Sequence, residues 1–256
     1  MRPVALLTDF GLSDHYVGVL HAVLERDAPG VVRVDLGHDL DAGDIWGASF
    51  QLRCAWPFLP DDCVVLAVVD PGVGTIRRAV ALAAGDRFLV GPDNGLTTVV
   101  GPPAAAVAID WRRMGLEAPS VTFHGRDLFA PAAARLAAGA DLGSLGDELE
   151  LSSLLPCPLP APVRVGRGIH GAILHVDRFG NLVTNVMAVG HADTTNATFA
   201  GRVARRVHTY AEAQPDEVVL LEGSAGYLEL AVNCGSAADA TGLERGDTVI
   251  ISTNEE

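Results

Sequence analysis

The N-terminal half of the chain takes its fold from the stretch Val64-Val65-Leu66-Ala67-Val68-Val69-Asp70-Pro71-Gly72-Val73-Gly74-Thr75. The six consecutive apolar residues that open it are typical of a short strand buried on both faces, as in parallel sheets. Asp70 follows directly, and the Pro-Gly-Val-Gly run after it predicts a turn. Ligands of open α/β sheets bind beyond the carboxyl ends of the strands. The stretch therefore predicts a buried strand that delivers Asp70 to a candidate site.

Strands and helices alternate on both sides of this stretch. The pattern predicts a strand at 4–7, a helix at 14–24, a strand at 31–36, a helix capped by Asp44 that ends before Pro57, and a helix at 126–138. Such alternation is typical of a mainly parallel sheet covered by helices on both faces. We therefore expect an α/β domain with a mainly parallel, Rossmann-like sheet sandwiched by helices.

A second region with a different pattern follows a Pro-rich segment. Proline occupies every second position from 156 to 162, which predicts a semi-rigid linker. Short strand-like runs come next, at 171–176, 202–207, 218–221, 227–232 and 248–252. Helical periodicity is weak there, so the pattern predicts a small all-β barrel or sandwich. The expected division is an N-terminal domain at 1–155, a linker at 156–168 and a C-terminal domain at 169–256.

Composition limits the classes of function. The formal net charge of the 256 residues is −14, which disfavours binding to a nucleic-acid backbone. No apolar run is long enough for a transmembrane helix, and the apolar N-terminal stretch is too short for a signal peptide, so we expect a cytoplasmic protein with no membrane partner. Four scattered cysteines without a C-x-x-C pair predict reduced thiols and no cysteine zinc site; they are Cys54, Cys63, Cys157 and Cys234.

Three polar segments of the first domain are candidates for one site. They are 8–14 with Asp9 and Asp14, 70–78 with Asp70 and Arg77, and 123–127 with His124. Each alone has an ordinary explanation, since an Asp after a strand is often a helix cap or turn residue and a lone His is often structural. An acid, a cation and a base in loops that one sheet edge brings together instead indicate a reactive site.

Two segments of the second domain are candidates for ligand contact. The segment 176–185 carries Asp177, Phe179 and Asn181, and 223–229 is a polar turn that runs into a strand. A hairpin turn alone explains the Gly-Asn pair in the first segment. The functional interpretation is a shelf on which Phe179 stacks against a flat heterocycle while Asn181 pairs with its edge.

Familiar catalytic motifs are missing from the sequence. Gly72 and Gly74 lack the third glycine of G-x-G-x-x-G, and no P-loop, H-E-x-x-H or EF-hand pattern occurs. Ser224 lacks the first glycine of a nucleophile elbow. These absences weaken assignments to dehydrogenases, nucleotide triphosphatases, metalloproteases and α/β-hydrolases.

Taken together, the segments resemble the S-adenosyl-L-methionine hydroxide adenosyltransferase family, which is related to the adenosyl fluoride and chloride synthases. The matching stretches are 7–11, 69–75 with Arg77, 123–127, 177–181 and 223–229, in order along nearly the whole chain. The resemblance implies an N-terminal α/β domain and a C-terminal β-barrel. It also implies a homotrimer whose active sites lie between the N-domain of one subunit and the C-domain of its neighbour, with no metal and no cofactor.

The resemblance also implies roles for single residues. The family's hydrolytic trio corresponds to Asp70, Arg77 and His124, and the acid that grips the ribose hydroxyls corresponds to Asp9. Adenine is held by the residues matching Phe179 and Asn181 and by backbone around Val232 to Cys234. Further substrate-binding positions near the methionine end or the pocket wall are Asp14, Asp177, Ser224, Tyr227 and Glu229.

Within this family the sequence favours water over halide as the nucleophile. Halide-using relatives carry another residue where Asp70 stands, and often a small hydroxyl residue where Gly125 stands. Ala225 replaces an Arg that the fluoride enzymes place against the substrate. We therefore expect hydrolysis of S-adenosyl-L-methionine to adenosine and methionine. The alternatives are a halide adenosyltransferase that makes 5′-halo-5′-deoxyadenosine and a non-catalytic adenosine sensor.

Overall fold

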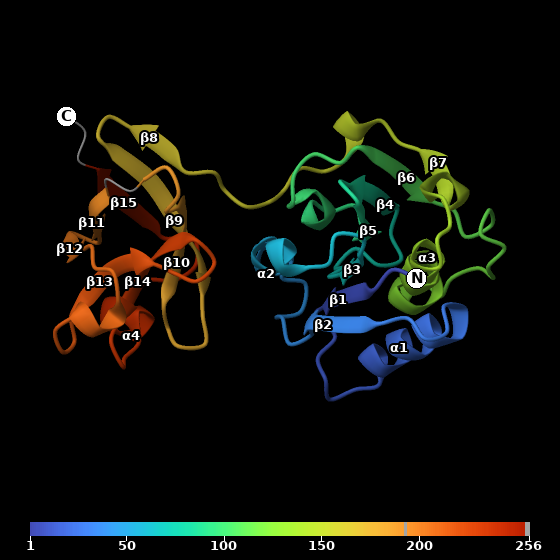
Figure 1. Ribbon diagram of the computed structural model, residues 1–256, viewed down its shortest axis with the longest axis horizontal. Coiled ribbons are helices and arrows are strands. Elements are labelled where there is room, and N and C mark those ends of the chain that lie inside the picture. The colour runs from blue at the N-terminus through green and yellow to red at the C-terminus, as the bar shows by residue number, and fades with distance from the viewer. Residues whose placement is uncertain (192–193, 254–256) are drawn as a thin grey trace. The chain divides into compact units, whose positions relative to one another are not determined.

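The computed structural model describes residues 1–191 and 194–253, and its chain forms two compact units, Met1–Pro158 and Leu159–Glu256 (Figure 1). The division between the units falls within the Pro-rich segment. Residues 192–193 and 254–256, which belong to the predicted C-terminal domain, lie outside the described residues.

The N-terminal unit contains a mixed seven-stranded sheet. Its strands, in spatial order, are β2 (Arg33–Gly37), β1 (Val4–Thr8), β3 (Val64–Val68), β5 (Arg87–Pro92), β4 (Ala79–Ala84), β6 (Ala105–Ile109) and β7 (Gly146–Glu148). The first four are parallel, whereas β4, β6 and β7 are antiparallel to their neighbours. The prediction of a mainly parallel sheet is therefore correct for only one part of the sheet. The reason lies at Gly85 and Asp86, because a two-residue connection between β4 and β5 can join only antiparallel strands.

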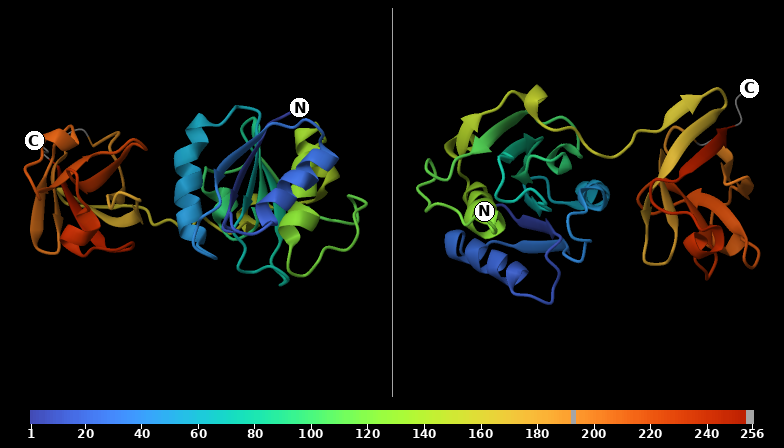
Figure 2. Two further views of the ribbon diagram at one scale, coloured as in Figure 1. Left: turned by 90° about the horizontal axis from the view of Figure 1, so that it is seen from below. Right: turned by 180° about the vertical axis from the view of Figure 1, so that it is seen from behind.

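Helices cover both faces of this sheet. Figure 2 shows α2 (Ile45–Ala55) on one side and α1 (Tyr16–Asp27) with α3 (Ala130–Ala137) on the other. The predicted cap is confirmed, because the Asp44 side chain accepts a hydrogen bond from the Gly47 amide at 3.0 Å and the helix ends before Pro57. The predicted helix at 126–138 is divided into a π-helical turn, Gly125–Phe129, and α3. Short 3₁₀ turns occupy Trp56–Phe58, Leu96–Thr98, Leu142–Ser144 and Leu151–Ser153.

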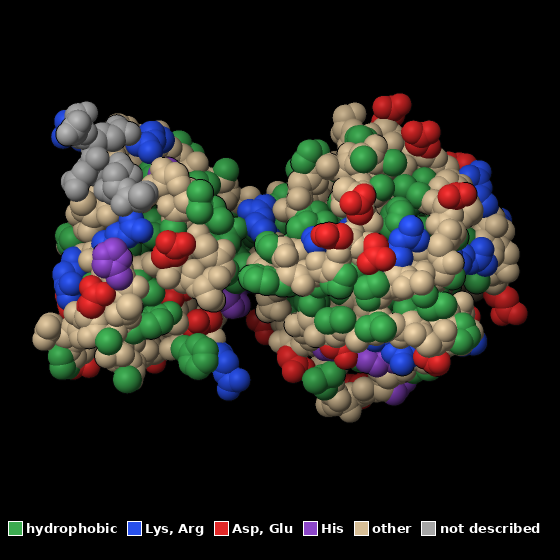
Figure 3. Space-filling model, in the orientation of Figure 1, with side chains coloured by type: hydrophobic (Ala, Val, Ile, Leu, Met, Phe, Trp, Pro, Cys, Tyr) green, Lys and Arg blue, Asp and Glu red, His purple; other side chains and the backbone are tan. Residues whose placement is uncertain are grey.

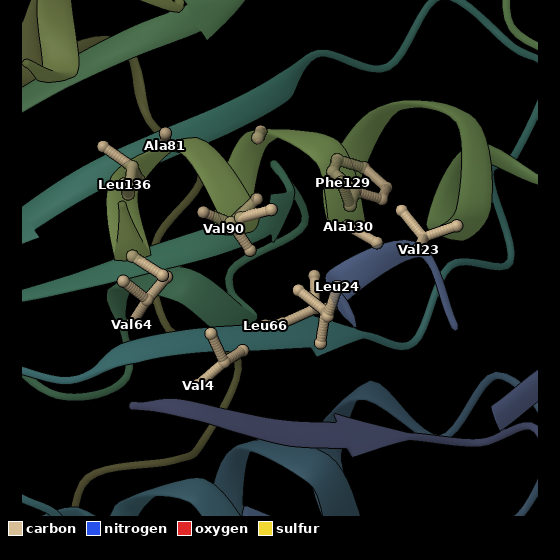
Figure 4. Close-up of a cluster of buried hydrophobic side chains, with 14 of the residues drawn as sticks. Val4, Val23, Leu24, Val64, Leu66, Ala81, Val90, Phe129, Ala130 and Leu136 are labelled. Atoms are coloured by element: carbon tan, nitrogen blue, oxygen red, sulfur yellow. The ribbon is translucent and has the colours of Figure 1, made fainter. Parts of the chain in front are cut away.

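The core of the N-terminal unit explains why β3 is apolar throughout. Val64 and Leu66 belong to the cluster between the sheet and helices α1 and α3, together with Leu24 and Phe129 (Figure 4). Val65 is also fully buried, and it alternates with these residues onto the opposite face. A strand covered on both sides needs apolar residues at every position, as the sequence predicted.

The C-terminal unit is an antiparallel, nearly closed barrel. Its strands follow the order β12 (Arg202–Arg205), β11 (Thr194–Phe199), β15 (Thr248–Thr253), β9 (Gly168–Val176), β10 (Leu182–Met187), β14 (Tyr227–Val232) and β13 (Val218–Glu222), with β8 (Val163–Val165) paired to β9. A bridge between Arg206 and Leu220 joins the two ends of this path. A short helix, α4 (Ala237–Thr241), and a 3₁₀ turn at Tyr210–Glu212 complete the unit.

Strand β10 was not predicted, because its sequence carries polar residues at buried positions. Thr184 and Asn185 are both buried, and each is satisfied by the backbone. Thr184 Oγ1 donates to the carbonyl of Leu228 at 2.7 Å, and Asn185 Nδ2 donates to that of Pro160 at 3.1 Å. Long-range hydrogen bonds of this kind stabilise a strand that local hydrophobicity does not reveal.

The surface charges, the helices and the cysteines can be compared with what the composition predicts. Acidic and basic side chains are interspersed over the face drawn in Figure 3. Across the described residues, no helix is both long and apolar enough to cross a bilayer. The four cysteines are free, as predicted, although Cys234 is exposed. Burial raises the pKa of the Cys54 and Cys63 thiols to about 11, so both are protonated at neutral pH.

Candidate active site

The loop after β3 turns back so that Arg77 lies beside Asp70. The amide of Val73 donates to the Asp70 carbonyl at 3.2 Å, and Thr75 Oγ1 donates to the Gly72 carbonyl at 2.7 Å. Both bonds close tight turns. They bring the end of the loop alongside its beginning, at the carboxyl edge of the parallel strands.

Asp70 and Arg77 form a bidentate ion pair that is largely shielded from solvent. Arg77 Nε donates to Asp70 Oδ1 at 2.8 Å, and Arg77 Nη2 donates to Asp70 Oδ2. The side chains are only 7% and 12% exposed, respectively. The guanidinium also lies over the ring of Phe129, 5.1 Å from its centre. Two parallel hydrogen bonds and a ring beneath fix the orientation of the carboxylate.

The same guanidinium fixes the protonation of His124. Arg77 Nη2 donates to His124 Nδ1 at 2.8 Å, and arginine has no acceptor, so Nδ1 must present its lone pair. Burial lowers the pKa of His124, and the nearby Arg77 lowers it further, against the opposing effect of Asp70. The ring is therefore neutral at neutral pH and carries its proton on Nε2. In this state His124 is a hydrogen-bond donor at Nε2 and has no free basic nitrogen.

A cavity of about 530 Å³ lies over these residues. It is lined by Asp9, Phe10, His15, Tyr16, Val68, Asp70, Val73, Ser120, Thr122, Phe123, His124, Gly125 and Arg126. Three aromatic rings form one wall, with Phe123 edge-to-face against both Phe10 and Tyr16 at centroid distances of 5.8 and 5.3 Å. This aromatic wall was not predicted, although Phe10 and Phe123 lie within the quoted motifs.

The structure gathers most of the candidate residues of the first domain around this cavity. Asp9 lines it, and its Oδ2 accepts a hydrogen bond from the amide of Gly43 at 2.7 Å. Asp70 and His124 line it as well, while Arg77 contacts both from behind. Asp14 is exposed in the loop before α1 and is not among the lining residues.

In the C-terminal unit, Asp177 holds a tight turn that presents Phe179. Its Oδ1 accepts from the amides of Phe179 and Asn181 at 2.8 and 2.9 Å, and its Oδ2 accepts from Asn181 Nδ2 at 3.0 Å. The Phe179 side chain is consequently held in solvent, with the residue 71% exposed. Asn181 is buried beneath it. An exposed ring on a rigid turn is suited to stacking against a planar ligand.

Glu229 is a buried acid in the same unit, and sequence analysis missed its partner. Tyr210 Oη donates to Glu229 Oε1 at 2.6 Å. Burial raises the pKa of Glu229, and Asp177 raises it further, against the effect of this hydrogen bond. Of the other candidates, Tyr227 and Val232 are buried on β14, whereas Ser224 is exposed in the preceding turn. The Tyr210–Glu229 contact joins residues 19 positions apart, beyond the reach of a local pattern.

An acid, a cation and a histidine that converge on a cavity at the carboxyl edge of a sheet define an enzyme with a small-molecule substrate. Comparison with known families gives the particular class. The two domain models of the S-adenosyl-L-methionine (SAM) hydroxide adenosyltransferase family match residues 4–146 and 171–250. The chain belongs to this family.

Individual relatives agree over almost their whole length. The chain is 44% identical to an (R)-S-adenosyl-L-methionine hydrolase of Thermus thermophilus, covering 96% of this chain and 98% of that one. A solved structure from Thermotoga maritima, described as an uncharacterized conserved protein, has 34% identity and a TM-score of 0.88 over 97% of this chain and 99% of that chain. A fluorinase of Actinoplanes sp. is 27% identical over 97% of both chains.

Gly74 allows the two loops of the site to pack together. Its φ is +77°, and a Cβ added there would lie 2.4 Å from the carbonyl oxygen of Val121. The loop that carries Asp70 and Arg77 thus approaches the backbone three residues before His124. Any side chain at position 74 would push these loops apart.

We expect Gly74→Ala to destabilise the protein by more than the ~1–2 kcal/mol that left-handed strain alone costs an alanine. Gly30→Ala is the matched control, since its φ is +80° and no atom of the residues that the structure describes lies within 4 Å of the added Cβ. Denaturant unfolding of both variants measures the difference. Equal losses would show that the contact with Val121 is not tight.

We expect NMR of the His124 ring to show a proton on Nε2 and a titration midpoint below the ordinary value of about 6.5. Because the unfolded chain then binds the proton more tightly, this group reduces stability as the pH falls below about 6.5. Replacing the cation with Arg77→Gln raises the midpoint. A proton found on Nδ1 in the unmodified protein would contradict the assignment.

Proposed function

We propose that the chain hydrolyses S-adenosyl-L-methionine to adenosine and L-methionine. The observation that carries the proposal is the Asp70–Arg77–His124 group at the edge of the cavity, in a member of this family. The relatives named (R)-S-adenosyl-L-methionine hydrolase cover nearly the whole chain and support the same reaction.

In the proposed reaction, the oxygen of a water molecule attacks C5′ of the adenosyl group in line with the C5′–S bond. That bond breaks with its electron pair going to sulfur, so the positively charged sulfonium leaves as neutral methionine. A sulfonium leaves without being protonated, so only the nucleophile needs to be activated. The water loses a proton, which passes through the site to solvent, and adenosine carries the new hydroxyl oxygen.

The hydrogen bonds among Asp70, Arg77 and His124 give each residue a different role in the proposed reaction. His124 Nδ1 already accepts from Arg77 and its Nε2 carries a proton, so His124 donates to the oxygen of the water. Asp70 retains free lone pairs beyond the two that Arg77 occupies, and it accepts the proton. General-base help of this kind contributes about 10²–10⁴ in rate. Rigid binding of the substrate supplies further acceleration through orientation.

The remaining candidates bind the substrate in this proposal. Asp9 accepts hydrogen bonds from the ribose hydroxyls with the capacity that Gly43 leaves free. Phe179 stacks on adenine, and Asn181 with the backbone around Val232 meets its edge. Pocket-wall and methionine-end positions are Asp14, Asp177, Ser224, Tyr227 and Glu229. S-adenosyl-L-methionine is the substrate, and neither a cofactor nor a metal ion takes part in the reaction.

We further propose a homotrimer that works in the cytoplasm, in which a neighbouring subunit brings Phe179 and Asn181 to the cavity. Apolar exposure beside the cavity supports the assembly: Ile76 in the Asp70 loop is fully exposed, and Val121 before His124 is 70% exposed. The loops that carry these two residues pack against each other at Gly74, and exposed apolar residues that lie near one another mark interaction surfaces. The four free cysteines fit a reducing compartment.

We expect the wild-type protein to release adenosine and methionine in equal amounts, with the 5′ oxygen of adenosine taken from oxygen-18 water. Asp70→Asn should lower kcat by about 10²–10⁴ without weakening the binding of adenosine. Asp61→Asn, at a 96% exposed side chain, is the control and should be unchanged. Reactions are run with each sulfonium epimer of the substrate, chromatography measures the amounts of the two products, and mass spectrometry measures the oxygen-18 content of the adenosine.

Chloride is added to a parallel reaction to test the halide alternative that the fluorinase relative represents. Formation of 5′-chloro-5′-deoxyadenosine in place of adenosine would overturn hydrolysis. Tight binding of substrate with no product would instead identify a sensor. Full activity of Asp70→Asn would leave hydrolysis standing but overturn the role of Asp70.

The shared site predicts complementation between inactive variants. Asp70→Asn damages only the N-terminal half of a site, and Asn181→Ala only the C-terminal half. If each site combines halves from two subunits, random mixing of the two variants restores about a quarter of the sites. Co-expression followed by an activity assay tests this. Mixtures as inactive as the separate variants would exclude a site shared between subunits.

A further inference from the structure

We propose that His21, Asp35 and His38 form a binding site for one divalent ion of the zinc class, separate from the cavity. His21 lies on α1, Asp35 on the edge strand β2, and His38 directly after that strand. None of the three lines the cavity. Two imidazoles and a carboxylate suit zinc, cobalt or nickel, whereas magnesium and calcium prefer sets made of oxygen alone.

The three ligand atoms already converge on a common point. Asp35 Oδ1 lies 2.9 Å from His21 Nε2 and 3.1 Å from His38 Nε2, and all three ligand atoms lie within 4.8 Å of one another. Tetrahedral zinc with bonds of 2.0–2.2 Å places its ligand atoms about 3.3–3.6 Å apart. The cluster therefore needs shifts of only a fraction of an ångström to a little over one to surround an ion.

His38 is the strongest single indication of a ligand. Its side chain is only 3% exposed, and among the described residues Nε2 has no hydrogen-bond partner of acceptable geometry, although it lies 3.1 Å from Asp35 Oδ1. A buried ring nitrogen without an aligned partner is costly. Its other nitrogen, Nδ1, lies 2.8 Å from Thr8 Oγ1. Metal-binding histidines are typically held in this way through the second nitrogen.

The surroundings of the three ligands are accessible to solvent, and the nearby cation is already paired with other groups. His21 and Asp35 have side chains that are 31% and 44% exposed, so solvent can reach the cluster and supply the remaining ligand. Figure 3 shows histidine and acidic side chains side by side at the lower edge of the N-terminal unit, over α1 and β2. The neighbouring cation, Arg33, is engaged by Glu25 at 2.9 Å and by the His21 carbonyl at 3.3 Å.

The position of the site gives the ion a structural role. His38 contacts Thr8, the last residue of β1, and Asp9 follows it into the cavity. An ion would tie α1 and the end of β2 to the end of β1. It would thus brace the strand that presents Asp9 without touching the substrate, which keeps this inference independent of the proposed reaction.

The test is calorimetric titration of tag-free, chelator-treated protein with zinc chloride. We expect one ion per chain and no binding of magnesium chloride. His21→Ala and Asp35→Asn should weaken zinc binding by more than the ~10–100-fold that loss of an outer-shell partner costs. His208→Ala, at an exposed position, is the matched control and should bind as the wild type does.

Thermal stability gives a second readout of zinc binding. Zinc should raise the melting temperature of the wild type and of His208→Ala but not of His21→Ala, and circular dichroism shows that each variant is folded. No binding to the wild type, or binding that His21→Ala leaves unchanged, would overturn the proposal.

Discussion

One planar guanidinium organises the active site. Arg77 directs two donors to the carboxylate of Asp70 and another N–H to Nδ1 of His124. This fork fixes the orientation of the acid and the tautomer of the histidine together, which the point charge of a lysine could not do. Because the group is largely buried and lies over Phe129, it is held by packing as well as by charge. In the proposed reaction, this one geometry makes Asp70 the proton acceptor.

The fold brings the three partners of this interaction together. Strand β3 is buried on both faces, and its register between β1 and β5 fixes where Asp70 emerges. The turn that follows carries Arg77 back beside Asp70. His124 precedes the π-helical turn that leads into α3, and this helix packs on the same sheet. The site is therefore precise because two loops are anchored to one rigid sheet, and Gly74 allows these loops to touch.

Sequence patterns predicted what depends on neighbours along the chain. The apolar run before Asp70, the cap at Asp44 and the strand at 227–232 are local signals, and the structure confirms all three. Pairings across long separations were not predictable. Arg77 and His124 are 47 residues apart, so the sequence could place both near one sheet edge but could not predict the hydrogen bond between them. The polar strand β10 was missed because tertiary hydrogen bonds stabilise it, and the antiparallel part of the sheet was missed because it depends on the two-residue turn at Gly85 and Asp86.

The charge of Asp70 also gives a physical reason for water as the nucleophile. In the proposed reaction the nucleophile lies against this carboxylate, and two negative charges about 4 Å apart repel by ~1–4 kcal/mol, depending on how far water screens them. A halide would meet that cost, whereas neutral water can donate a hydrogen bond to the same oxygen. Arg77 offsets part of this repulsion through its ion pair with Asp70, but Asp70 lines the cavity and Arg77 does not, so an anion in the cavity meets the carboxylate first. In the proposed reaction, Asp70 therefore both accepts the proton and disfavours anions that compete with water.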